Sequence, residues 1–292
     1  MSIKTFTEEH TEGYNLQWKI KSILHQETSA YQEITVAETV QFGRCLILDG
    51  AMQITVQDAF IYHELMAHIC LASHPHPQQV LIIGGGDGGM IKEVLKHPMV
   101  EKITLVEIDE RVVALSKKYL PEFSRSLEHP KVNVVIEDGF DFIAKHKNQF
   151  DVILVDSSDP SGPAAPLFSS KFYELVEAGL KDKGIFTAQI GSPLFELEKL
   201  KTVYKRVKKL FQNTSYYMAS IPTYSTGPYS LIYGSKGIDP LELRDVSYLD
   251  GQTRYYTPEI HRASFALPPF IQEVLQESTE SKVLSAQSRK QI

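Results

Sequence analysis

Acidic residues that interrupt or directly follow apolar runs are the first candidates for chemistry in this chain. Asp87 lies within a glycine-rich run, Glu107 lies near the end of the next apolar run, and Asp156 follows the apolar segment 151–155. A buried carboxylate attracts a cation, and it can accept a proton from a group bound beside it. These acids therefore indicate a pocket for a positively charged ligand.

The glycine-rich run 84–89 (GGGDGG) comes directly after the apolar residues 80–83 and before a predicted helix over 90–96. Glycines allow a tight turn in which a ligand can approach backbone N–H groups at the start of a helix. Gly84 and Gly86 are expected to line this nucleotide-type pocket. Glu107 is then placed to accept hydrogen bonds from the hydroxyls of a ribose.

Two ligand classes fit this order of strand, glycine loop, helix, strand and acid: nicotinamide dinucleotides and adenosyl sulfonium compounds. A pyrophosphate would face Asp87, Asp138, Asp156 and Asp159, which Coulomb repulsion disfavours. A sulfonium ligand is not repelled in this way. Asp138, in the acidic turn after 132–136, is placed to accept a hydrogen bond from the exocyclic amine of adenine. The charges therefore favour an adenosyl sulfonium compound.

The segments that must position these residues show two different patterns of secondary structure. Short alternating runs at 14–24, 31–37, 40–48 and 51–55 predict antiparallel hairpins, and 58–72 is predicted to be an amphipathic helix. From residue 78 onward strands and helices alternate, which is typical of a parallel sheet. The predicted strands are 79–83, 103–107, 132–136, 151–155 and 185–190, and a hairpin of 215–221 and 229–235 completes the sheet.

Composition narrows the class of protein. The chain has 292 residues and a net charge of −6, which argues against nucleic acid as a partner. Cys45 and Cys70 are isolated, which indicates a reducing compartment, and the sequence shows neither a signal region nor a membrane span, so we expect a cytoplasmic protein. The histidine pairs 74/76 and 63/68 lack a third partner, so no metal site is expected.

Several motifs together resemble those of the aminopropyltransferases, specifically the spermidine synthases. They are GGGDGG at 84–89, VEID at 106–109, EDG at 137–139, DSSDP at 156–160 and IPTY at 221–224. The resemblance covers roughly residues 14 to 276. It implies an α/β fold in which a Rossmann-like, methyltransferase-type, mostly parallel seven-stranded sheet has helices on both faces. The expected parts are an N-terminal β-hairpin domain (1–57), the catalytic domain (58–276) and a mobile tail (277–292).

The resemblance implies transfer of an aminopropyl group from decarboxylated S-adenosylmethionine to putrescine, which gives spermidine and methylthioadenosine. No cofactor is expected beyond this donor, and a homodimer or tetramer is expected. Cadaverine, agmatine or spermidine remain alternative acceptors. An S-adenosylmethionine-dependent methyltransferase and a non-catalytic polyamine- or nucleoside-binding protein remain alternative functions.

The same resemblance implies roles for individual residues. Asp156 would accept the proton of the attacking amine, and Tyr62 would assist it. Asp87 would attract the ammonium of the donor and repel the carboxylate of ordinary S-adenosylmethionine. The donor site would comprise Gln32, Gln53, Asp87, Glu107, Asp138, Gly139 and Pro163, with Gly84 and Gly86, and the acceptor site would comprise His63, Asp87, Asp156, Ser157, Ser158, Asp159 and Tyr224.

Three departures from the usual motifs concern the acceptor side. Ala59 stands where many relatives have Glu, and Gly191 stands where an acidic residue is common. The segment 225–229 (STGPY) replaces a more usual P-S-G followed by an aromatic residue. These departures leave the acceptor less certain than the reaction type, because one displaced carboxylate can change the preferred length of an amine.

Overall fold

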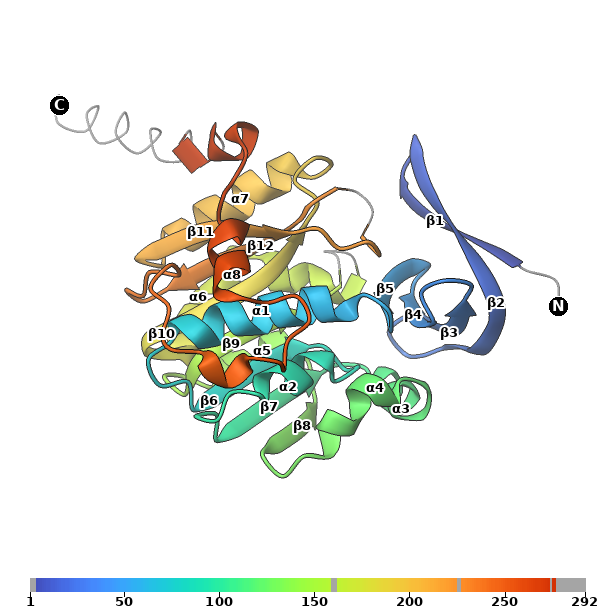
Figure 1. Ribbon diagram of the computed structural model, residues 1–292, viewed down its shortest axis with the longest axis horizontal. Helices are drawn as coiled ribbons and strands as arrows, with labels where there is room; N and C mark the ends of the chain where they lie inside the picture. Colours follow the sequence, from blue (N-terminus) through green and yellow to red (C-terminus); the bar gives the residue numbers. More distant parts are fainter. Residues whose placement is uncertain (1–3, 159–161, 225–226, 274, 277–292) are drawn as a thin grey trace.

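The short alternating runs near the N-terminus form one antiparallel sheet. The structure, a computed structural model, describes residues 4–158, 162–224, 227–273 and 275–276. The five strands, in spatial as well as chain order, are β1 (Lys4–Thr11), β2 (Tyr14–Thr28), β3 (Glu33–Thr39), β4 (Arg44–Leu48) and β5 (Ala51–Thr55). Strand β1 was not predicted, and it extends with β2 as a long hairpin beside the rest of the molecule (Figure 1). The predicted mobile tail, 277–292, lies outside the described residues.

The apolar runs from residue 79 onward form a second sheet of seven strands, which confirms the predicted fold class. Its strands are β6 (Gln79–Gly84), β7 (Lys102–Glu107), β8 (Val132–Ile136), β9 (Phe150–Asp156), β10 (Leu180–Gly191), β11 (Asn213–Ala219) and β12 (Tyr229–Ser235). The spatial order is β11-β12-β10-β9-β6-β7-β8, and the pairings from β10 to β8 are parallel, whereas β12 is antiparallel to both of its neighbours. The chain turns to opposite sides of β6, so a ligand crevice is expected at the carboxyl ends of β6 and β9.

Helices cover both faces of this sheet (Figure 1). On one face α1 (Ala59–Ser73) and α2 (Gly89–Val94) share a buried apolar cluster with the strands, and on the other face α5 (Gly139–Lys145), α6 (Ser170–Gly179) and α7 (Leu197–Lys208) do so. Helix α3 (Glu110–Tyr119) packs instead against the N-terminal sheet. The remaining helices are α4 (Pro121–Ser124), α8 (Pro258–Ser264) and the 3₁₀ turns η1 (Arg125–Glu128), η2 (Gly162–Phe168) and η3 (Ser247–Leu249).

Helix α1 is buried on nearly every side, so the prediction that it is amphipathic was wrong. All of its residues except Phe60 and Ile61 are buried. The reason is that a late segment of the chain covers the side of α1 that would otherwise face water. The carboxylate of Glu64 accepts hydrogen bonds from the backbone N–H groups of residues 254, 255 and 256, at 2.8–3.1 Å. This buried charge is satisfied by backbone donors.

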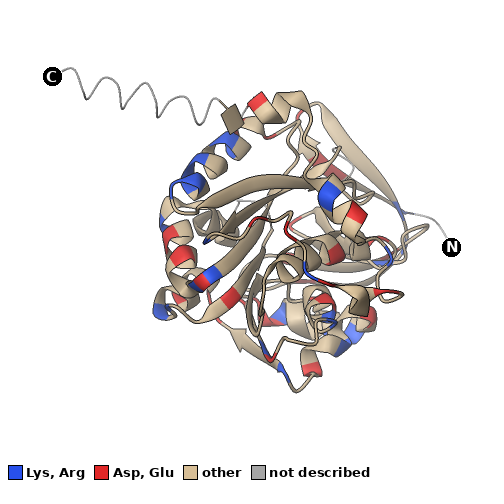
Figure 2. Ribbon diagram, turned by 60° about the vertical axis from the view of Figure 1, so that its left-hand side comes forward, with Lys and Arg blue, Asp and Glu red and all other residues tan. Residues whose placement is uncertain are grey.

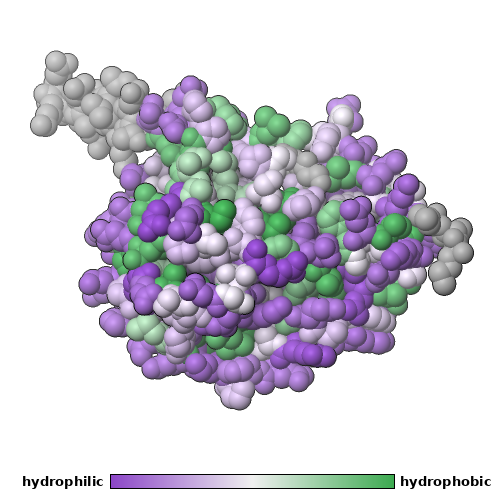
Figure 3. All heavy atoms as spheres, viewed as in Figure 1, coloured by the Kyte–Doolittle hydropathy of each residue, from purple (hydrophilic) through white to green (hydrophobic). Residues whose placement is uncertain are grey.

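The outer surface is polar and mixed in sign. Figure 2 shows basic and acidic residues interspersed over the outer helices and turns. In the view of Figure 3, apolar residues form separate patches between polar ones. Among the described residues, we find no helix with the length and apolar character needed to cross a membrane.

Candidate active site

A cavity of about 460 Å³ lies between the N-terminal sheet and the carboxyl ends of the parallel strands. Its walls come from β1, β4 and β5, from α1, from the glycine loop after β6, and from the ends of β7, β9 and β10. Residues far apart in the sequence therefore meet in one space. Every residue predicted for the site lines this cavity except Asp159, which lies outside the described residues.

Glycines at the end of β6 allow the acids to approach one another. Gly84 has a φ of +82°, and a Cβ there would lie 2.1 Å from the carbonyl oxygen of Asp156. A Cβ on Gly86 would lie 2.9 Å from the side chain of Glu107. Side chains at these positions would push the strands and the acids apart, so the glycine loop is needed for the packing as well as for access.

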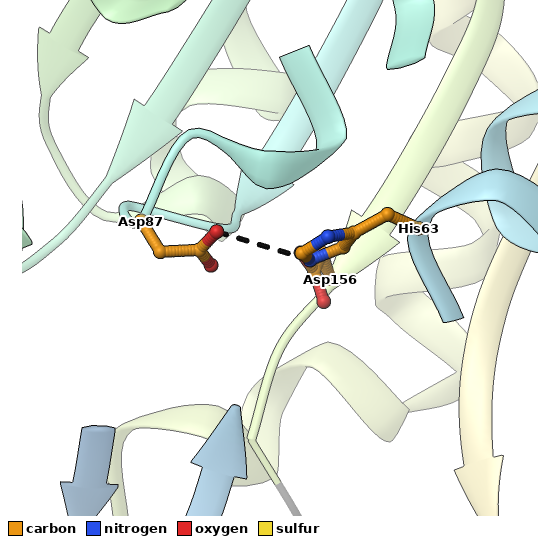
Figure 4. A group of neighbouring side chains, drawn as sticks. All are labelled: His63, Asp87 and Asp156. Carbon is orange, nitrogen blue, oxygen red and sulfur yellow. Dashed lines mark ion pairs between the residues drawn. The ribbon is translucent and has the colours of Figure 1, made fainter. Parts of the chain in front are cut away.

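Asp87, His63 and Asp156 point toward one space, from the glycine loop, α1 and the end of β9 (Figure 4). One ligand atom of each lies within 4.8 Å of the others, and His63 Nε2 is 3.8 Å from Asp87 Oδ1. Burial, together with the nearby charge of Asp156, raises the pKa of Asp87 to about 8. Burial lowers the pKa of His63 to about 4, so the imidazole is neutral near pH 7 and does not balance the carboxylates. The group suits a cation, which can be an ammonium or a metal ion.

Tyr62 and Asp156 form a hydrogen-bonded pair. The Tyr62 hydroxyl donates to Asp156 Oδ1 at 2.8 Å. Burial, with the nearby charge of Asp156, raises the pKa of Tyr62 well above its usual value, so this hydroxyl remains a donor. Burial raises the pKa of Asp156 to about 6, although the bond from Tyr62 acts in the opposite direction. A carboxyl group with such a pKa can exchange a proton near neutral pH.

Glu107 is held in a fixed orientation by backbone donors. Its Oε2 accepts from the N–H of Gly86 at 3.1 Å, and its Oε1 accepts from the N–H of Asp109 at 3.0 Å. Burial raises its pKa to about 7. The carboxylate therefore links the glycine loop to the end of β7 and still faces the cavity.

Asp138 and Gly139 begin helix α5. Asp138 Oδ1 accepts from the N–H groups of Phe140 at 2.7 Å and Asp141 at 3.2 Å, so the side chain caps the helix. Both bonds use the same oxygen, and the residue also lines the cavity. A Cβ on Gly139 would lie 2.3 Å from Ile83 Cγ2, which explains the glycine by packing.

Residues from the N-terminal sheet and the segment after β9 complete the walls. Gln32 Nε2 donates to Asp109 Oδ2 at 3.0 Å, and Gln53 Nε2 donates to the carbonyl of Ala51 at 3.2 Å. Pro163 lies in η2. Ser157 and Ser158 follow β9 directly.

One wall of the cavity is aromatic, and it includes Tyr229, which was not predicted for the site. Gln189, which lies beside Tyr229, was not predicted either. Tyr224 donates to the carbonyl of Gln53 at 2.6 Å, and its ring centre is 5.9 Å from that of Tyr62 and 4.7 Å from that of Tyr229. The hydroxyl of Tyr229 donates to Gln189 Oε1 at 2.6 Å. Gln189 Nε2 donates to the carbonyls of residues 157 and 158 at 3.0 and 3.1 Å. A large amide inside a predicted buried strand was the available signal for Gln189.

The first strand also contributes to the cavity. Glu8, His10 and Thr11 line it. Because β1 was not predicted, none of these residues was a candidate.

Comparisons with known proteins find the same family by sequence and by structure. Residues 59–243 match the family described as the spermine/spermidine synthase domain, and residues 5–55 match the spermidine synthase tetramerisation domain. The polyamine aminopropyltransferase of Shouchella clausii is 49% identical over 270 residues, which cover 92% of this chain and 98% of that protein. A solved spermidine synthase in complex with the transition-state analogue AdoDATO has a TM-score of 0.90 and 38% identity, with 94% of this chain and 95% of the other covered. The spermidine synthase from Thermotoga maritima has a TM-score of 0.87 and 37% identity, with 94% of each chain covered.

Proposed function

Because this chain belongs to the spermine/spermidine synthase family, we propose that it transfers the aminopropyl group of decarboxylated S-adenosylmethionine to putrescine, forming spermidine and methylthioadenosine. It is a polyamine aminopropyltransferase, an enzyme that moves an alkyl group other than methyl. The observation that carries the proposal is the pair of carboxylates, the buried Asp87 and the partly buried Asp156, that face one cavity beside a neutral histidine. Both substrates are cations, and such a cavity attracts them.

On the donor side, Asp87 binds the ammonium of the aminopropyl group. Glu107 binds the ribose hydroxyls, while Asp138 and Gly139 contact the adenine. The remaining donor contacts come from Gln32, Gln53, Pro163 and the backbone at Gly84 and Gly86. All of these residues line the cavity, and Glu107 is already oriented by two backbone donors. No cofactor is required beyond this donor.

On the acceptor side, Asp156 takes a proton from the amine that attacks. The nitrogen forms a bond to the aminopropyl carbon next to sulfur, the carbon–sulfur bond breaks, and its electron pair stays on sulfur as a neutral thioether. Tyr62 holds Asp156 Oδ1, which leaves Oδ2 for the amine. His63, Ser157, Ser158 and Tyr224 line the acceptor path, and Asp159 is proposed for it from the sequence alone.

The experiment that tests this function measures methylthioadenosine release by the purified protein with decarboxylated S-adenosylmethionine. Putrescine, cadaverine, agmatine and spermidine are compared as acceptors, and we expect putrescine to give the highest kcat/KM. Preference for another amine would change the acceptor but not the reaction. No release with any amine, from a folded protein that binds the donor, would favour a binding protein, and methyl transfer from S-adenosylmethionine would favour a methyltransferase.

The raised pKa values predict that the donor binds more tightly as pH rises. In the empty cavity Asp87, with a pKa near 8, is largely protonated at pH 6 and cannot pair with an ammonium. We expect the Kd for decarboxylated S-adenosylmethionine to fall from pH 6 through pH 8 and to level off at about pH 9, one unit above the pKa of Asp87. Titration calorimetry without acceptor measures this. Methylthioadenosine, which lacks the ammonium, is the control, and an equal pH dependence for both ligands would contradict the assignment.

The same pKa shift has a consequence for folding. Because the folded pKa of Asp87 lies above its usual 3.8, its contribution to stability is greatest at low pH. That contribution is lost as pH rises from about 4 to about 8, since an ionised carboxylate is then buried without an opposite charge beside it. A bound ammonium removes this cost. The donor should therefore raise the melting temperature more at pH 8 than at pH 6.

We propose a homodimer or tetramer that assembles through the N-terminal sheet. The match of residues 5–55 to a tetramerisation domain supports this, and so do the exposed apolar side chains of Ile23, Leu24 and Val40. Light scattering at micromolar concentration should give at least the mass of two chains, and the mass of one chain would contradict the proposal.

We also propose two domains, 1–57 and 58–276, and a cytoplasmic location. The proposed reaction uses no metal, since the sulfonium is already a good leaving group. In this proposal the group of His63, Asp87 and Asp156 therefore serves ammonium ions.

A further inference from the structure

The carboxylate of Glu196 occupies the space that a side chain at position 191 would need. Gly191 ends β10 with a φ of +97°, and a Cβ built on it would lie 1.9 Å from Glu196 Oε2. Both residues line the cavity. The missing acid at position 191 is thus matched by a carboxylate that reaches the same place from five residues later in the chain.

The turn between β10 and α7 holds this carboxylate in place. The backbone N–H of Glu196 donates to the carbonyl of Ser192 at 2.9 Å, and Glu196 Oε2 accepts from the N–H of Ser192 at 3.2 Å. Lys199 Nζ donates to Oε1 at 2.5 Å. The neighbouring Phe195 stacks on Tyr14 of the first hairpin, with ring centres 5.4 Å apart. Lys199 holds Oε1, and its Nζ lies 3.0 Å from the place of a Cβ on Gly191. Oε2, on the side of Gly191, accepts from the N–H of Ser192 and has a further lone pair for a ligand.

The register of the sheet places this carboxylate at a useful distance from Asp156. Val155 pairs with Ala188, so Gly191 lies two residues beyond the point opposite Asp156. Two residues of a strand span about 7 Å and neighbouring strands lie about 4.8 Å apart, so the backbone positions of Asp156 and Gly191 are separated by more than the length of one strand residue in both directions. This leaves room for a short diamine with a hydrogen bond to a carboxylate at each end. Gln189 and the ring of Tyr229 lie along the same part of the cavity.

We propose that Glu196 binds the far ammonium of the acceptor, and that position 191 is glycine because this carboxylate needs the space. The inference rests on the proposed function and defines its substrate class as a short diamine rather than a monoamine. One end of the diamine loses its proton to Asp156 and the other remains charged at Glu196. Glu8, another acid in the cavity, accepts from Trp18 Nε1 and from the N–H of Met52, both at 2.9 Å, and Glu196 likewise has one donor on each oxygen. The choice of Glu196 therefore rests on its place beside Gly191.

The test compares Glu196→Gln with Glu198→Gln, a matched control. The Glu198 side chain is 85% exposed, and its partner is Lys201 at 3.1 Å. Each protein is assayed with decarboxylated S-adenosylmethionine and either putrescine or butylamine, which has the same carbon chain and one amine. Glu196→Gln should raise the KM for putrescine by about 10- to 100-fold, because a hydrogen bond between charged groups is lost. Its kcat at saturating putrescine, its KM for the donor and its activity with butylamine should stay within about threefold of the original protein, which is the scatter expected of such values.

The control variant should keep the KM for putrescine and the preference for putrescine over butylamine. An unchanged preference in Glu196→Gln would overturn the inference, and so would an equal loss with both amines, which a purely structural role predicts. If Glu196→Gln does not fold, Glu196→Asp should show the same selective rise in KM for putrescine, because the shorter side chain withdraws the carboxylate. If the original protein releases no methylthioadenosine with any amine, the proposed function itself fails, which is a different result.

Discussion

Replacing Asp156 with Asn is expected to lower kcat by about 100- to 10,000-fold, the contribution usual for a positioned proton acceptor. An amide cannot take the proton of the attacking amine. The substitution keeps the size of the side chain, and the Tyr62 hydroxyl can still donate to Oδ1 as it does at 2.8 Å. Donor binding should therefore change little, and single-turnover formation of methylthioadenosine together with calorimetric donor binding measures the two effects separately.

Two further variants serve as comparisons in this experiment. Asp182→Asn makes the same change at an exposed position and should leave kcat unaltered. Tyr62→Phe removes only the hydrogen bond to Asp156, so its loss of kcat should be smaller than that of Asp156→Asn. If Asp156→Asn retains most of the original turnover, another group accepts the proton and the assignment is wrong.

Replacing Asp87 with Asn should reduce the selectivity of the protein for decarboxylated S-adenosylmethionine over ordinary S-adenosylmethionine. Asn can still accept the hydrogen bond that the Gly89 N–H makes to Asp87 Oδ1 at 2.7 Å, so the loop should keep its shape. Affinity for decarboxylated S-adenosylmethionine should fall by about 10- to 100-fold, since a charged hydrogen bond is lost. Affinity for ordinary S-adenosylmethionine should rise, because its carboxylate no longer meets a like charge.

Calorimetric Kd values for both ligands at about pH 9, above the pKa of about 8 of Asp87, give the ratio directly. Methylthioadenosine, which has neither the ammonium nor the carboxylate, should bind the variant and the original protein alike. An unchanged ratio of the two Kd values would show that another residue selects the decarboxylated donor.

The central parallel strands β6 and β9 were predictable because they are buried on both faces. Strands β6 and β9 are nearly continuous apolar runs, as such strands must be, and their carboxyl ends place Asp87 and Asp156 in one crevice. The chemistry of these two residues could therefore be read from their position after a strand. Glu107 and Asp138 were also found in the cavity, but the structure adds that backbone N–H groups hold both carboxylates.

Other features depend on contacts between distant parts of the chain, which a local pattern does not contain. Strand β1 has few apolar residues, and it pairs only with β2, so its sequence (KTFTEEHT) gave no clear signal. The burial of α1 depends on a segment that follows it by about 190 residues. Gly191 by itself indicated only a lost acid. The position of the Glu196 carboxylate beside Gly191 depends on the turn between β10 and α7, whose geometry the sequence does not reveal.

The link between Glu64 and residues 254–256 also bears on the order in which the protein is made. Helix α1 carries Tyr62, His63 and Glu64, and the backbone donors for Glu64 leave the ribosome about 190 residues later. Until then the nascent chain has a carboxylate next to its future active site that cannot be buried without a large cost. A polypeptide whose translation stops just before residue 254 is therefore expected to remain inactive, although all of the described residues that line the cavity have already been synthesised.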